Sequence, residues 1–264
     1  MKKKSIDKND LVTAPKSKSK GPERIQKLLA QAGVGSRRQV EKWIEEGAIH
    51  VNGGVAKLGD KITARDEVRL KGRPVKLEGK IQVETEVLIY HKPAGEIVSK
   101  RDPEGRPSVF KRLPRLKTGR WISVGRLDLN TQGLLVFTND GELANQLMHP
   151  SHQVEREYAV RVMGVVTKEM VEKLVNGIEL EDGKARFEDI HESGGEGINR
   201  WFHVVVAEGR NRVVRRLWES LGCKVSRLIR VRYGSVFLPP GLPTGQHQFL
   251  DKKEVKELKR VASL

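Results

Sequence analysis

The segment Gly125–Asp128 places a carboxylate where it could act on a substrate. It follows directly after Trp121–Val124, a hydrophobic run with the character of a short strand. Loops at strand ends expose their side chains to clefts, so the Asp128 carboxylate is a candidate nucleophile or proton acceptor. An aspartate in a loop also commonly forms a turn, so its chemical role depends on what the rest of the chain provides.

Other reactive residue types are sparse, which narrows the chemistry. The chain has one cysteine, Cys223, and seven scattered histidines. We find no paired His and Cys, no serine in a nucleophile motif, and no carboxylates or thiolates at a metal-ligand spacing. A metal-dependent nuclease is therefore excluded, no metal or cofactor is expected, and Asp128 remains the strongest catalytic candidate.

Charge and hydrophobicity indicate the kind of partner. The 264 residues include 50 Lys and Arg against 34 Asp and Glu, a formal net charge of +16. Such a surplus attracts polyanions, with nucleic acid as the first candidate, an anionic membrane surface as the second, and simple solubility as the neutral alternative. No apolar run approaches the roughly 18 residues of a membrane span, and no secretory signal is evident. We therefore expect a cytoplasmic protein without a membrane partner, acting as a monomer.

Hydrophobic periodicity predicts a small first domain behind a basic tail. Residues 1–21 are rich in Lys and Ser and are expected to be a disordered tail. Residues 22–70 are expected to contain two short helices, the second capped by Ser36, and a small sheet with an Asn52-Gly53 hairpin turn. Residues 71–85 are polar and rich in Lys and Gly, which is typical of a linker.

Residues 86–255 are expected to form a second domain, followed by a tail at 256–264. Helices are expected near 168–175 and 211–221, and the predicted strands are Val87–Tyr90, Trp121–Val124, Leu134–Thr138, Tyr158–Val162, Trp201–Val206 and Val225–Val231. Strands outnumber helices and do not alternate with them. The pattern therefore predicts an α+β fold with a mainly antiparallel mixed sheet and flanking helices.

The first domain resembles the S4-type RNA-binding domain over about residues 23–70. The matching segments are Arg24–Leu29, Gly35–Arg38 and Gly47–Gly53. The resemblance implies that the helical pair grips structured ribosomal RNA. Arg37 and Arg38 at the start of the second helix, with Lys42 one turn later, would supply its phosphate-binding face.

The second domain resembles the pseudouridine synthases. The matching segments, in the family's order, are Lys92–Gly95, Gly125–Leu135, Arg156–Val160, Glu208–Arg216 and Leu238–Gly245. With the S4-type domain, nearly the whole ordered chain is similar to the branch that modifies bacterial ribosomal RNA. The resemblance implies a pseudouridine synthase fold, no cofactor, and a ribosomal RNA substrate that is expected to come from the large subunit.

The resemblance also assigns roles to three residues. Asp128 matches the catalytic aspartate, which either adds to the base or takes a proton from the sugar while N1–C1′ is exchanged for C5–C1′. Arg215 matches the basic partner that keeps this carboxylate ionised. Tyr158 matches the active-site aromatic residue, whose ring would stack on the target base. Without the resemblance, Tyr158 would be interpreted as a core strand residue.

Nearby arginines are expected to contact RNA. Arg126 matches a position that fills the gap left when a uridine swings out of a helix, and a phosphate contact is the alternative. The Arg-rich stretch that begins at Arg210 predicts a phosphate-binding surface. In this stretch we expect contacts from Arg210, Arg212 and Arg216.

Two other functions stay open at this point. One is an S4-type ribosome assembly factor without chemistry, and the other is a pseudouridine synthase that acts on small-subunit RNA. The joint presence of Asp128, Tyr158 and Arg215 in matching segments favours an enzyme over the first alternative.

Overall fold

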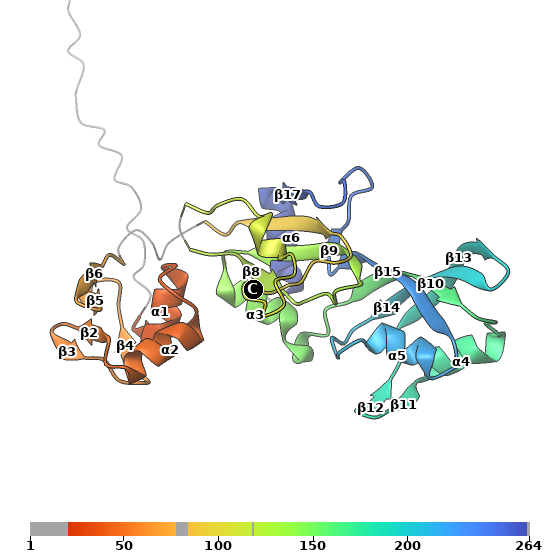
Figure 1. Ribbon diagram of the computed structural model, residues 1–264, viewed down its shortest axis with the longest axis horizontal. Helices are drawn as coiled ribbons and strands as arrows, with labels where there is room; N and C mark the ends of the chain where they lie inside the picture. Colours follow the sequence, from red (N-terminus) through yellow and green to blue (C-terminus); the bar gives the residue numbers. More distant parts are fainter. Residues whose placement is uncertain (1–20, 78–83, 118, 263–264) are drawn as a thin grey trace, which may run out of the picture. The chain divides into compact units, whose positions relative to one another are not determined.

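The computed structural model describes residues 21–77, 84–117 and 119–262, and the chain divides into two compact units. One is built mainly from residues up to 77 and the other from residue 84 onward. Each is described by itself (Figure 1). Residues 1–20 of the expected tail and 78–83 of the expected linker lie outside the described residues.

In the first unit, α1 (Ile25–Gln31) and α2 (Arg37–Glu45) each bury one apolar face. Apolar residues at helical spacing produce these faces, for example Val40 and Ile44 on α2. Ser36 caps α2 as expected, because its hydroxyl accepts a 3.1 Å hydrogen bond from the backbone amide of Gln39.

A small antiparallel sheet completes the first unit. Its strands are β2 (Ile49–Val51), β3 (Gly54–Val55), β5 (Val68–Leu70) and β6 (Arg73–Val75) in the order β3-β2-β5-β6, and β1 (Glu23–Arg24) pairs separately with β4 (Lys61–Ile62). The Asn52-Gly53 turn has positive φ at both residues, as a tight hairpin requires. The sheet runs past the expected boundary at residue 70, because Lys71 and Gly72 form a second turn with positive φ that returns β6 onto β5.

The second unit is organised around a nine-stranded mixed sheet. Its main path is β13-β14-β10-β15-β9-β7-β17, with β16 beside β15 and β8 beside β9. The strands are β7 (Val87–Lys92), β8 (Ile122–Val124), β9 (Gln132–Thr138), β10 (Arg156–Met163), β13 (Asp189–Glu196), β14 (Asn199–Val206), β15 (Lys224–Tyr233), β16 (Val236–Phe237) and β17 (His247–Phe249). Among the described strands of this sheet, β9 and β15 are the one parallel pair. The expected α+β class and mainly antiparallel sheet are therefore confirmed.

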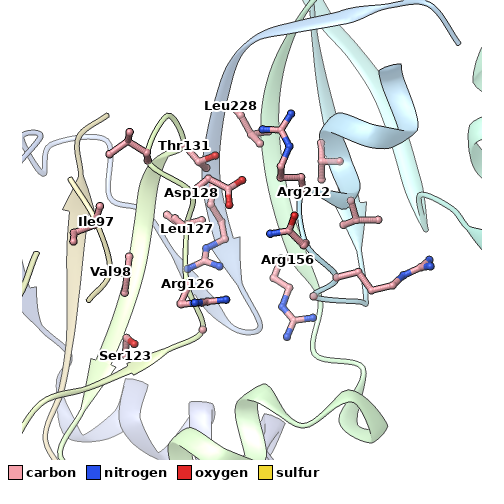
Figure 2. A pocket seen from close by; sticks show the side chains of 18 of the residues that line it. Ile97, Val98, Ser123, Arg126, Leu127, Asp128, Thr131, Arg156, Arg212 and Leu228 are labelled. Carbon is pink, nitrogen blue, oxygen red and sulfur yellow. The ribbon is translucent and has the colours of Figure 1, made fainter. Parts of the chain in front are cut away.

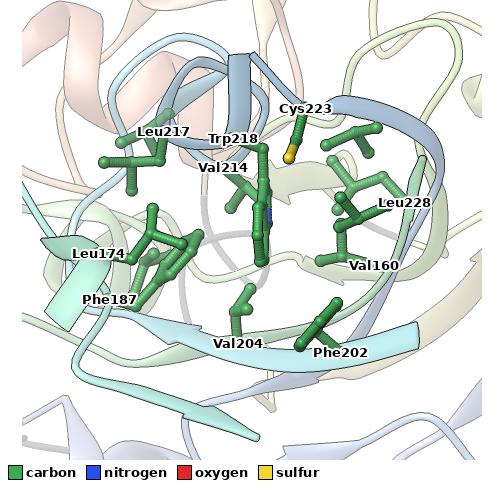
Figure 3. Packing of buried hydrophobic residues seen from close by; sticks show 14 of the residues in the cluster. Val160, Leu174, Phe187, Phe202, Val204, Val214, Leu217, Trp218, Cys223 and Leu228 are labelled. Atoms are coloured by element: carbon green, nitrogen blue, oxygen red, sulfur yellow. The ribbon is translucent and has the colours of Figure 1, made fainter. Parts of the chain in front are cut away.

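Helices and a hairpin cover this sheet around three hydrophobic cores. The elements are α3 (Gly141–Met148), α4 (Lys168–Asn176), α5 (Val213–Glu219), α6 (Lys252–Val261), and the hairpin of β11 (Ile178–Leu180) and β12 (Gly183–Ala185). Trp218 of α5 is fully buried among Phe187, Phe202 and Val204 in the first core (Figure 3). The second core lies under α3 and α6, and the third surrounds Tyr90 and Phe137.

The expected C-terminal tail is partly helix. α6 continues through residues 256–261, and Leu258 and Ala262 are fully buried in the second core. Asp251 and Glu254 form a capping box at its start. The boundary at residue 255 fails because the apolar side chains after it recur at helical spacing. Among the described helices, none has the length and hydrophobicity to cross a membrane.

Candidate active site

Asp128 lies in the loop between β8, which ends at Val124, and β9, which begins at Gln132. Leu127 is buried in the third core and anchors the loop. The Thr131 amide donates a 3.1 Å hydrogen bond to the Asp128 carbonyl, which closes a tight turn. The Asp128 side chain is half-buried, so the loop holds the carboxylate at a surface that a substrate can reach.

A cleft of about 880 Å³ opens beside this loop. Asp128 and Arg126 lie on one wall, and Arg156 and Arg212 lie on the facing wall (Figure 2). Of the sequence-predicted residues, the cleft brings together Asp128, Tyr158, Arg126, Arg210 and Arg212.

A buried lysine holds the loop from below. The Lys92 ammonium group is fully buried at the end of β7 and donates to the carbonyl oxygens of Pro93 (2.9 Å), Leu129 (3.3 Å) and Thr131 (2.9 Å). The Gly95 amide also donates to the Leu129 carbonyl, at 2.8 Å. Three of these hydrogen bonds, to the carbonyls of Leu129 and Thr131, therefore tie the active loop to the end of β7 and the turn after it.

The charge of Lys92 is finely balanced. Burial lowers the pKa of Lys92 to about 8, and the negative charges of Glu96 and Asp128 oppose that shift. Glu96 is itself buried and accepts a 2.6 Å hydrogen bond from the Tyr90 hydroxyl. The pKa of Tyr90 is raised by burial and by this contact with Glu96. A chain of buried ionisable groups thus lies under the catalytic candidate.

Arg215 approaches Asp128 through the loop backbone. Its guanidinium donates to the carbonyl oxygens of Val225 (2.9 Å) and Asn130 (3.3 Å). Burial and the neighbouring Arg212 lower the pKa of Arg215, and the Asp128 charge opposes them. The described residues contain no N–O contact within 4 Å between Arg215 and Asp128, so Arg215 reaches the loop by its hydrogen bond to the Asn130 carbonyl and Asp128 by charge alone.

Tyr158 lies where the two halves of the second unit meet. It is half-buried on β10 and packs against both the first and the third hydrophobic core. Its cross-strand neighbour on β15 is Arg230. The ring also lines the cleft, which suits a surface for stacking on a base.

Arg126 and Arg212 have the exposure expected of RNA contacts. Arg126 is exposed, and no residue in the described part of the chain hydrogen-bonds its guanidinium. Arg212 is exposed at the start of α5, has a positive φ of 50°, and forms a 3.1 Å ion pair with Glu219. Both side chains line the cleft.

Arg210 and Arg216 are instead engaged within the protein. Arg210 donates to Asp182, to the carbonyls of Gly183 and Lys184 in the β11–β12 hairpin, and to Glu208. Arg216 makes two hydrogen bonds to the Asp182 carboxylate, at 2.8 and 2.9 Å. Because an RNA phosphate would have to displace these partners, the structure gives both arginines a role in holding the hairpin.

The remaining predicted RNA contacts belong to the first unit. Arg37 and Arg38 are exposed in the first turn of α2. Lys42 is exposed one turn later, 3.7 Å from Glu46. The three cations therefore lie on one helix, Arg37 and Arg38 in its first turn and Lys42 in its last turn.

Sequence reasoning missed three cationic residues around the cleft. Lys92 belongs to the matching segment Lys92–Gly95, but its burial has no local signature in the sequence. Arg156 does have a signal: it precedes Tyr158 by two residues, and strand alternation puts both on one face. Arg230 lies opposite Tyr158, but that pairing requires knowledge of the sheet register.

Comparisons with protein families match both units. The model described as RNA pseudouridylate synthase matches residues 86–220, and the model described as S4 domain matches residues 23–68. A solved structure described as a crystal structure of pseudouridylate synthase aligns with a TM-score of 0.62 at 26% identity, covering 89% of this chain and 99% of that chain.

Curated relatives match across both units. Proteins named ribosomal large subunit pseudouridine synthase B are 57% identical in Pseudomonas aeruginosa and in Vibrio cholerae, and 54% identical in Escherichia coli strain K12. Each alignment covers 92% of this chain. The chain spans 63% of the length of the Pseudomonas relative, 76% of the Vibrio relative and 84% of the Escherichia relative.

Proposed function

The chain belongs to the RNA pseudouridylate synthase family, with an S4 domain ahead of the family region, and from this premise we propose that it converts a uridine of large-subunit ribosomal RNA to pseudouridine. The names of the relatives support the large-subunit target. The observation that carries the proposal is the cleft, which is lined by the Asp128 carboxylate, the Tyr158 ring and several arginines.

We assign the catalytic role to Asp128. The net reaction breaks the N1–C1′ bond, turns the base, and forms a C5–C1′ bond; C5 loses a proton and N1 gains one. An anionic carboxylate can act in either route, by adding to the base or by taking a proton from the sugar. The burial of Leu127 and the three hydrogen bonds to the loop carbonyls support a carboxylate held in place before RNA arrives.

Tyr158 and Arg126 serve the base in this proposal. A uridine within a helix must leave its stack to reach Asp128, at a cost of a few kcal/mol. Tyr158 offers a ring face inside the cleft, and Arg126 offers an exposed side chain two residues before Asp128 to occupy the vacated place. Arg215 stabilises the anionic carboxylate through its charge and holds the loop backbone through the Asn130 carbonyl.

The first unit would hold the RNA through Arg37, Arg38 and Lys42, and Arg212 would add a phosphate contact at the cleft. The described residues of one chain supply every group used here, which supports action as a monomer. The buried, unpaired Cys223 is consistent with a reducing cytoplasm.

The test is to incubate the protein with unmodified large-subunit and small-subunit ribosomal RNA and to map pseudouridine in both. We expect one modified site in the large-subunit RNA. Asp128→Asn should bind RNA with wild-type affinity and form no product, because the amide has neither the charge nor the basicity of the carboxylate. The matched control is Asp189→Asn on exposed β13, which should keep full activity.

Three outcomes would overturn parts of the proposal. Absence of product in both RNAs would favour a non-catalytic assembly factor. Product confined to the small-subunit RNA would move the target. Product formation by Asp128→Asn at the wild-type rate would remove Asp128 from the chemistry.

A further inference from the structure

Three arginines around the cleft have buried side chains without a carboxylate partner. Their exposed fractions are 9% for Arg156, 7% for Arg215 and 2% for Arg230, and none forms an ion pair within the described part of the chain. Buried charges in proteins are normally paired, because an unpaired charge loses its hydration without compensation. Arg215 has the charge of Asp128 nearby. Arg156 and Arg230 form no ion pair with Asp128 or with any other acid in the described residues.

The other acids of the cleft are already occupied. Asp102 is bound by Arg106 through hydrogen bonds of 2.7 and 3.0 Å, and Glu208 is bound by Arg210. The cleft therefore carries two buried positive charges that form no ion pair within 4 Å with any described carboxylate. An anionic group of a bound ligand could neutralise these two charges.

The two guanidiniums are held in a built arrangement. They contact the ring of buried Tyr233, and the central carbon of each guanidinium is 5.1 Å from the ring centroid. Arg156 donates to the Ala207 carbonyl at 3.0 Å and to the Tyr233 hydroxyl at 3.2 Å. Tyr233 in turn donates to the Leu147 carbonyl at 2.8 Å. The positions of these charges are thus set before a ligand binds.

Arg230 is only half satisfied. Its Nε donates to the Leu134 carbonyl at 2.8 Å, but its Nη2 is buried without a hydrogen-bond partner in the described residues. A buried donor left unpaired costs free energy, so a residue kept in this state indicates a ligand or a long-range electrostatic role.

Arg156 and Arg230 lie close enough to Tyr158 for one nucleotide to reach all three side chains. Arg156 precedes Tyr158 by two residues on the same face of β10, about 7 Å along a strand, and Arg230 lies directly across from Tyr158 on β15. Both arginines line the cleft together with Tyr158. A base stacked on Tyr158 would therefore bring its own backbone phosphate toward the two cations.

We propose that Arg156 and Arg230, packed against Tyr233, form a subsite for a phosphodiester group of the nucleotide strand whose base enters the cleft. The subsite rests on the proposed function for its substrate, RNA. Arg156 makes the contact, since it is the more exposed of the two, and Arg230 adds its charge from behind. The subsite holds the extruded nucleotide by its backbone and does not read the base.

The first measurement needs no catalysis. RNA affinity is measured at several salt concentrations for three proteins. They are Asp128→Asn itself, which is the reference, and the double variants that add Arg156→Gln or Arg161→Gln to it. Glutamine keeps a donor for the Ala207 carbonyl and removes the charge. Arg161 lies on the same strand, three residues after Tyr158 and on the opposite face, and does not line the cleft. We expect Arg156→Gln alone to bind about tenfold more weakly and to lose about one unit of salt slope.

The second measurement locates the phosphate. Single backbone linkages around the mapped target uridine are replaced by uncharged methylphosphonates. One linkage beside the uridine should weaken wild-type binding about tenfold and should have no further effect on Arg156→Gln. Arg230→Gln should behave in the same way if it folds, as checked by its melting temperature.

The outcomes separate this subsite from the proposed function. Salt slopes equal to wild type in Arg156→Gln would overturn the subsite and leave Arg156 a purely structural residue, even if pseudouridine is formed. If the losses of affinity caused by Arg156→Gln and by the methylphosphonate linkage multiply when the two are combined, that phosphate does not bind at Arg156. A reduced slope without any product in either ribosomal RNA would keep the anion site and defeat the enzymatic proposal.

Discussion

The position of Asp128 depends on Lys92, whose ammonium group binds the loop backbone after Asp128. The carbonyl groups that follow it along the loop point at the Lys92 ammonium, which has no contact with solvent. Burying an ammonium group is costly unless hydrogen bonds replace its water, and three carbonyl acceptors replace it here. Removal of Lys92 would free the loop, so the geometry of the carboxylate and the stability of the unit are linked through one side chain.

Lys92→Met tests that link through pH. We expect the variant to lose about 1–3 kcal/mol in unfolding free energy at pH 7, since carbonyls are left without donors. The pKa of Lys92 is about 8 in the fold and 10.5 as its ordinary value. Between these values the unfolded chain binds more protons, so raising the pH stabilises wild type. The difference in unfolding free energy between wild type and Lys92→Met should therefore grow from pH 8 to 10, by up to about 1.4 kcal/mol per pH unit.

Urea unfolding of both proteins at pH 7, 8, 9 and 10 measures this gap. Lys111→Met, at an exposed position, should show a small difference from wild type that stays constant over the same range. If the difference in unfolding free energy between wild type and Lys92→Met does not change with pH, Lys92 keeps its proton in the folded protein over this range and its pKa is not lowered.

Arg126 should matter only when a base has to leave a helix. We expect Arg126→Ala to lower kcat/KM at least about tenfold on a uridine held in a duplex, where extrusion costs a few kcal/mol. On a short RNA with the same uridine unpaired, the loss should be small. Single-turnover rates on the two RNAs provide the comparison, with Arg161→Ala as control. Equal losses on both RNAs would favour the alternative, a plain phosphate contact.

At the scale of elements, the cleft depends on the one parallel contact in the described sheet. β9 and β15 pair at Gln132–Ile229 and Gly133–Arg230, and this contact joins the part of the sheet that carries Asp128 to the part that carries Tyr158. Gly133 has φ of +101°, and a Cβ there would lie 2.2 Å from the Arg230 carbonyl oxygen. Only glycine lets the two backbones approach so closely.

Gly133→Ala should therefore be severely destabilising. Backbone strain and overpacking each cost about 1–3 kcal/mol, and together we expect a loss of about 3 kcal/mol or more. Gly183→Ala separates the two terms, because Gly183 has φ of +102° but open space around its Cβ position; it should lose only about 1–2 kcal/mol. Urea unfolding of both variants gives the comparison. Equal losses of unfolding free energy would show that the close approach of Gly133 to Arg230 does not add to the cost of the substitution.

The elements that carry the site could be predicted because their signals are local. β8 and β9 are short apolar runs on either side of a glycine-flanked loop, and α5 follows from apolar residues at helical spacing around Trp218. The partners of Arg210 and Arg216 could not be predicted. Both bind Asp182 in a hairpin of three-residue strands, and such short strands leave no readable alternation. The boundary at residue 255 failed for a related reason, since charged residues in α6 mask its few apolar positions.

In the proposed function, the first unit binds RNA, and the second carries the chemistry and further RNA contacts at the cleft. Lysine and arginine exceed the acids by a net +16, yet many of the arginines around the cleft are engaged with acids or carbonyl groups. Of the arginines proposed here to contact RNA, three have no partner in the described residues: Arg126 at the cleft, and Arg37 and Arg38 on α2, all exposed. A charge surplus alone therefore overstates the number of phosphate contacts, and the two units can be tested separately.

Arg37→Ala/Arg38→Ala makes that test. These side chains lie in a different unit from Asp128, and we propose that they hold RNA in both its ground and its transition state. Such uniform binding changes KM and leaves kcat alone. We expect KM to rise at least about tenfold, kcat to stay within about twofold of wild type, and the salt slope of RNA binding to fall by about two.

Arg65→Ala/Arg69→Ala is the charge-matched control, because both residues are exposed in the same unit and belong to β5 and the turn before it. It should leave KM and the salt slope close to wild type. Equal effects of the two double variants would mean that net charge alone attracts the RNA. A loss of kcat at unchanged KM in Arg37→Ala/Arg38→Ala would instead mean that α2 orients the RNA for reaction, because saturating substrate cannot restore a rate that depends on orientation.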